Sequence, residues 1–127
     1  MIVSSVISTP TIKMCLVLVL TLVSGWADAQ GFVHASTIWV DGRLQIASFA
    51  RSAVGYSVGI GAYWLTLPFL VDVGVVAPEV QTALWFAVTL VGVAVTSGAF
   101  LGWRLIDQLV AAGVLCGLGW LFTHSVR

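Results

Sequence analysis

The sequence predicts an all-α integral membrane protein, a bundle of four transmembrane helices at about residues 13–36, 49–71, 82–100 and 105–122. Hydrophobic residues make up 60% of the 127-residue chain and charged residues 8%, whereas a soluble domain carries about 25% charged residues. The mean hydropathy is +1.10. Each apolar run approaches the ~20 residues that a helix needs to cross a bilayer. We therefore expect one transmembrane domain over residues 13–124, preceded by an N-terminal tail at 1–12.

Charge and cysteine usage exclude several function classes. Five basic and five acidic residues cancel, so the chain lacks the basic surface with which proteins bind nucleic acid. Cys15 and Cys116 lie in apolar runs without metal-ligand spacing, which is typical of small hydrophobic side chains. No nucleophile elbow, HExxH pair or pair of carboxylates indicates hydrolysis. We expect neither an enzyme nor a metal or other cofactor, and the lipid bilayer as the main partner.

The first predicted helix contains the residue that matters most for function. Asp28 would lie inside the membrane or close to its edge. An ionisable residue at that depth is costly and by default marks a functional site. Gly31, three residues later on the same face, predicts close approach of a second helix.

A second interpretation of this segment remains open. Lys13, the apolar run 15–23 and the small-residue segment 27–29 also fit a cleavable secretory signal, whose removal would delete Asp28. Charge placement favours the uncleaved helix. After cleavage the three arginines of the later loops would all face the exterior, against the usual excess of basic residues in cytoplasmic loops.

The distribution of basic residues gives only a weak orientation. With four spans, Lys13 and Arg127 share one side of the membrane, and Arg43, Arg51 and Arg104 share the other. The side with three arginines exceeds the side with the termini by one basic residue. Because the side richer in basic residues usually faces the cytoplasm, we expect both termini outside. The alternative is dual insertion, with oppositely oriented copies pairing antiparallel.

The second predicted helix combines small and aromatic residues. Gly55 and Gly59 form a small-xxx-small pair suited to helix packing. Tyr56 and Tyr63 are seven residues apart and therefore lie on nearly the same side of the helix. Tyr63 and Trp64 are either faces of a binding cavity or ordinary interface aromatics.

The remaining features are a turn, a tryptophan and another glycine pair. Asp41 and Gly42 predict a turn between the first two helices. Trp85 lies one turn inside the third helix. In the fourth, Gly113 and Gly117 predict close packing inside the bundle or against another copy.

The order of these features resembles the small multidrug resistance proteins of the drug/metabolite transporter superfamily. The resemblance covers about residues 23–122 and includes four spans with an intramembrane carboxylate in the first. Tyr56 lies where the family has a tyrosine facing the substrate cavity, and Trp85 lies where span three carries a tryptophan. The segment 100–105 resembles the family's turn into span four. The glycine-rich fourth helix would correspond to the family's dimerisation helix.

The chain also departs from the family pattern. The family's carboxylate is a glutamate, and alignment on the small residues near Ser36 places Trp26 at its position. Asp28 is two residues further on, which rotates it by about 200° around the helix. Trp103 replaces an acidic residue of the turn, and the loop between spans two and three is longer. The equivalence of Asp28 with the family's carboxylate therefore stays open.

The resemblance implies a small transporter or flippase of the bacterial inner membrane, proton-coupled through Asp28 and acting as a homodimer. Burial would disfavour the charged carboxylate, so a proton and a cationic or lipid-like substrate could compete for it. The rings of Tyr56, Tyr63, Trp64 and Trp85 would offer faces to a cation. The alternative is a non-catalytic membrane subunit that packs into a larger complex through glycine faces. A holin-like lysis protein is disfavoured by the lack of a basic C-terminal tail.

Overall fold

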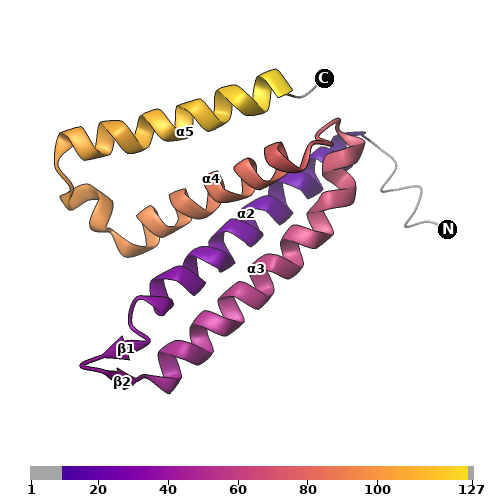
Figure 1. The fold of residues 1–127 in the computed structure, drawn as a ribbon. Coiled ribbons are helices and arrows are strands. Elements are labelled where there is room, and N and C mark those ends of the chain that lie inside the picture. The colour runs from indigo at the N-terminus through magenta and orange to yellow at the C-terminus, as the bar shows by residue number, and fades with distance from the viewer. Residues whose placement is uncertain (1–9, 126–127) are drawn as a thin grey trace.

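A computed structural model describes residues 10–125 and shows an all-α chain, which confirms the predicted class (Figure 1). The four long helices are α2 (Pro10–Ala35), α3 (Ile46–Asp72), α4 (Pro78–Ser97) and α5 (Leu105–Ser125). Their ends differ from the predicted spans by at most four residues. The first helix begins at Pro10, inside the predicted tail. Residues 1–9 and Arg127 lie outside the described residues.

Three of the helices, α2, α3 and α4, are long and apolar enough to cross a membrane. The apolar stretch of α5, Leu105–Leu121, is shorter. Length and composition thus indicate a helical membrane protein.

A tight hairpin joins α2 to α3. Its strands are β1 (Trp39–Val40) and β2 (Arg43–Leu44), which pair antiparallel. Asp41 and Gly42 both have positive φ, 50° and 73°, as a two-residue type I′ turn requires. The predicted turn is therefore confirmed, whereas the two short strands were not expected from the sequence.

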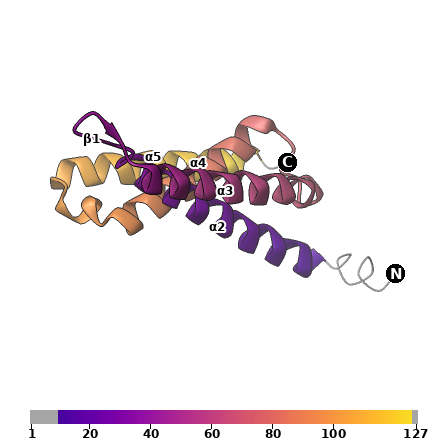
Figure 2. The same ribbon diagram turned by 90° about the horizontal axis from the view of Figure 1, so that it is seen from below.

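The helix α2 lies between α3 and α4 and packs against both, whereas α5 lies beside α4 (Figures 1 and 2). At the end of the molecule away from the hairpin, a small core forms from Val17, Leu70, Val75 and Val80. The structure is therefore a three-helix unit with α5 attached through α4. The four predicted helices are all present, and α5 contacts the rest of the chain mainly through α4.

Glycines set the close approach within the three-helix unit. A Cβ atom added to Gly55 would come within 2.7 Å of the Gly31 backbone nitrogen, and one on Gly92 within 2.8 Å of the Ala29 Cβ. By contrast, a Cβ on Gly113 or Gly117 would meet nothing within 4 Å. Gly31 and Gly55 therefore lie where α2 and α3 approach each other, whereas no other described residue lies close to the added Cβ positions of the α5 pair.

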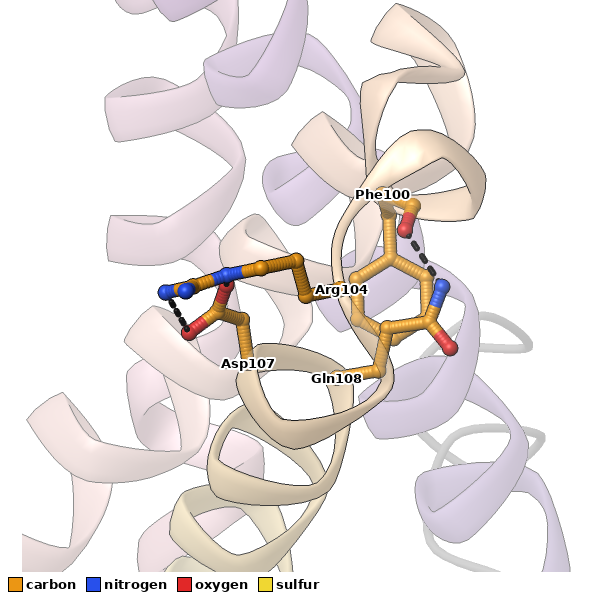
Figure 3. Close-up of polar contacts among 4 residues, drawn as sticks. All are labelled: Phe100, Arg104, Asp107 and Gln108. Carbon is orange, nitrogen blue, oxygen red and sulfur yellow. Dashed lines mark hydrogen bonds and ion pairs between the residues drawn. The ribbon is translucent and has the colours of Figure 1, made fainter.

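The connection from α4 to α5 returns the chain at the same end as the hairpin (Figure 1). Gly98 ends α4 in the left-handed conformation (φ 66°), and the 3₁₀ helix η1 (Ala99–Gly102) follows. Figure 3 shows the contacts that hold this turn: Gln108 Nε2 donates to the Phe100 carbonyl (2.8 Å), and Arg104 Nε lies 3.0 Å from Asp107 Oδ2. Asp107 thus lies in the first turn of α5 and pairs with Arg104.

Candidate functional site

Asp28 lies in the middle of the three-helix unit. Its side chain is 1% exposed, on the face of α2 that it shares with Ser24 one turn earlier. Gly59 of α3 stands directly opposite, and a Cβ there would come within 2.6 Å of Asp28 Oδ2. The missing side chain at position 59 therefore makes the space that the carboxyl group occupies.

A tryptophan from the third helix binds this carboxyl group. Trp85 Nε1 donates to Asp28 Oδ2 at 2.7 Å and lies 3.1 Å from Ser24 Oγ. The Ser24 hydroxyl in turn donates to the Gly59 carbonyl at 2.7 Å. The cluster therefore links α2, α3 and α4 through polar contacts. Such contacts stabilise membrane helix association by about 0.6 kcal/mol on average and up to about 1.7 kcal/mol.

The second carboxyl oxygen, Oδ1, is buried without a hydrogen-bond partner. Within residues 10–125 the ion pairs are Lys13–Asp72 and Arg104–Asp107, and neither includes Asp28. A charged carboxylate buried without a cation is strongly disfavoured. The site therefore favours a state in which Asp28 carries a proton or has gained a cation.

A small cavity adjoins the cluster. It has a volume of about 10 Å³ and is bordered by Ser24, Trp85, Tyr63, Thr66 and Gln81 among others. A space of roughly 10–15 Å³ holds one water molecule. In this conformation the junction is closed, and a drug-sized molecule does not fit beside Asp28.

The structure divides the aromatic residues that the sequence grouped. The Tyr63 and Trp85 rings lie 5.4 Å apart, and of the two the Trp85 indole binds Asp28. Tyr56 instead packs on Gly31 and meets Phe32 edge-on at 5.1 Å.

Trp64 is 66% exposed and, with Tyr56, borders a separate open hollow of about 350 Å³ on α3. The expected single cavity lined by all four aromatic side chains is therefore not present in this conformation.

Sequence reasoning missed two parts of the site. It did not anticipate that the Trp85 indole would reach Asp28, although both side chains could have been matched as a buried donor and acceptor. It also missed the α2–α4 contact at Gly25, where a Cβ would come within 3.0 Å of the Val88 carbonyl carbon. The spacing of seven residues between Trp85 and Gly92 could have indicated which face of α4 meets α2, because it places both residues on one side of the helix.

Comparisons of the chain with protein-family models, with curated proteins and with solved structures found no match.

Proposed function

We propose that this protein is a small transporter of the drug/metabolite type, in which Asp28 binds a proton in exchange for a cationic substrate and two copies act together. The supporting observation is the burial of Asp28 among three helices; within residues 10–125 one of its oxygens has no partner and neither ion pair includes it. An asparagine at position 28 would also accept the Trp85 hydrogen bond. Packing alone therefore gives no reason for an ionisable group, whereas proton exchange requires one.

The cycle that we propose begins from the closed junction. Release of a proton leaves a charged carboxylate that the dry junction disfavours. Separation of α4 from α2 would then admit water or a cation to Asp28. The neighbouring Tyr63 and Trp85 rings would offer aromatic faces to that cation. Binding of a new proton would allow the Trp85 hydrogen bond and the glycine contacts to form again.

The test is flux in reconstituted vesicles, with the fluorescent aromatic cation ethidium as the probe and an imposed proton gradient. We expect Asp28→Asn to abolish gradient-driven uptake while leaving the helical content and membrane insertion unchanged. Asp72→Asn is the matched control, because Asp72 lies at the end of α3 in an exposed ion pair. Equal uptake by wild type and Asp28→Asn, above that of empty vesicles, would contradict a role for the carboxyl group.

A second candidate function rests on α5. Among its described side chains none is buried, and a cleft of about 550 Å³ with almost wholly apolar walls separates it from α4. A helix so incompletely packed suits a membrane subunit that assembles with a larger complex. Absence of flux from both wild type and Asp28→Asn, together with stable co-purification of larger membrane proteins, would favour this function.

The proposed dimer can be tested through a natural cysteine. Cys116 is exposed on α5, between Gly113 and Gly117. Oxidation of a Cys15→Ser variant in the membrane should give a disulfide-linked dimer if two α5 helices pack together. Loss of that product in a Gly113→Leu variant would support packing through the glycine face, and a monomer under all conditions would contradict it.

A further inference from the structure

A groove separate from the Asp28 junction follows the seam between α2 and α3. It has a volume of about 500 Å³ and is open along one side. One end carries the polar side chains of His34 and Arg51, and the other carries Trp26 and Val58.

The helix register places these two ends at different depths. The Ser52 hydroxyl donates to the Gly31 carbonyl at 2.8 Å, so the last turn of α2 lies beside the first turns of α3. His34 and Arg51 therefore lie at the hairpin end. Trp26 precedes His34 by eight residues, which is about 12 Å along a helix. The groove thus begins polar near the hairpin. It passes Gln30, whose amide donates to Thr96 Oγ1 of α4 at 3.0 Å, and is otherwise apolar toward Trp26 and Val58.

The guanidinium at the polar end has no partner within the described part of the chain. Arg51 is exposed, and neither of the ion pairs found in residues 10–125 includes it. The hairpin beside it exposes 67% of Trp39, a residue type that prefers the depth of the lipid headgroups. At that depth the anionic group available to a guanidinium is a lipid phosphate. The planar guanidinium can donate two parallel N–H hydrogen bonds to that phosphate.

We infer that this groove binds one anionic phospholipid, with its phosphate on Arg51 and His34 and an acyl chain along Trp26 and Val58. Basic pockets between membrane helices are a recognised mode of lipid headgroup binding. Here the single cation supplies preference for an anionic headgroup, and the apolar length of the groove supplies contact area. This site does not depend on Asp28 or on transport, so it goes beyond the proposed function.

The test measures lipid retention by native mass spectrometry of the full chain in detergent, with added dioleoyl phosphatidylglycerol or dioleoyl phosphatidylcholine. We expect wild type to retain phosphatidylglycerol at least fivefold more than phosphatidylcholine. Arg51→Gln should remove this preference, whereas Arg43→Gln, at an exposed arginine of the hairpin outside the groove, should keep it. Equal retention of the two lipids by wild type, or equal losses in both variants, would overturn the assignment.

A second pair of variants tests the apolar part of the site. Val58 borders the apolar end of the groove and is half exposed, so Val58→Trp should fill that end and reduce phosphatidylglycerol retention several-fold. Ala53, exposed on α3 outside the groove, provides the control Ala53→Trp. Excess inorganic phosphate should not displace the lipid, because phosphate makes no use of the apolar walls. Displacement by phosphate, or no difference between the two tryptophan variants, would show that no lipid site of this kind exists.

Discussion

The hydrogen bond from Trp85 to Asp28 provides a direct test of how the three-helix unit is held together. Replacing Trp85 by phenylalanine keeps an aromatic ring in place but removes the N–H group that donates to Asp28 Oδ2 at 2.7 Å. With Oδ1 already unpartnered, both carboxyl oxygens would then be buried without a donor. Leaving a buried polar group unsatisfied costs about 1–3 kcal/mol.

A double-mutant cycle separates this hydrogen bond from packing. We expect Trp85→Phe to lower the free energy of unfolding by about 1–3 kcal/mol in the wild-type background. In an Asp28→Ala background the same substitution should cost less, because no carboxyl group is left unsatisfied. The difference should be about 1–2 kcal/mol, near the upper end measured for polar contacts between membrane helices.

The assay is equilibrium unfolding in mixed micelles by titration with sodium dodecyl sulfate, followed by circular dichroism. All four proteins of the cycle are measured under one set of conditions. Additive effects, with a coupling smaller than about 0.3 kcal/mol, would refute the contact, since independent sites add within that limit. Gln108→Leu, which removes a hydrogen bond in the turn before α5, is a control expected to show no coupling to Asp28.

Three further predictions follow from the same contacts. Gly59→Ala should destabilise the protein by about 1–3 kcal/mol through overpacking against Asp28. At the control position Gly61 an added Cβ would meet nothing within 4 Å, so Gly61→Ala should be neutral or stabilising by up to about 1 kcal/mol. A similar loss of stability in both variants, measured by the same detergent titration, would contradict the close contact. Lys13→Met should lower the free energy of unfolding by less than about 1 kcal/mol, because the ion pair of Lys13 with Asp72 is partly exposed. The loss should shrink with added salt. A large loss that does not depend on salt would contradict a screened surface ion pair. Gly42→Ala should weaken the hairpin by about 1–2 kcal/mol because the φ of Gly42 is positive. The weakening should appear as faster amide exchange at Gln45, whose N–H donates to the Ile38 carbonyl at 2.7 Å; unchanged exchange would contradict the turn geometry.

The sequence was informative where the signal was local. Apolar run length predicted all four helices, and the Asp41–Gly42 pair predicted the turn because few other residues accept positive φ there. Gly55 and Gly31 lie at a helix contact, and the sequence signal for it is also local, since small residues at helical spacing act through backbone approach.

The arrangement of helices was not predictable in the same way. Apolar helices in lipid have no hydrophobic force that requires them to close into one bundle, so the position of α5 beside α4 does not follow from its composition. Tyr56 and Tyr63 share a helix side by spacing, but their contacts differ because Gly31 accepts one ring and Trp85 meets the other. Which side chains meet depends on the register between helices, and a single sequence does not encode that in any short pattern.

Proton binding by Asp28, at a position enclosed by α2, α3 and α4, underlies the proposed function. Its most direct test is infrared spectroscopy of the reconstituted protein at neutral pH, comparing wild type with Asp28→Asn and with Asp72→Asn. We expect a protonated-carboxyl absorption in wild type and Asp72→Asn that is missing from Asp28→Asn. Identical spectra for all three proteins would contradict it.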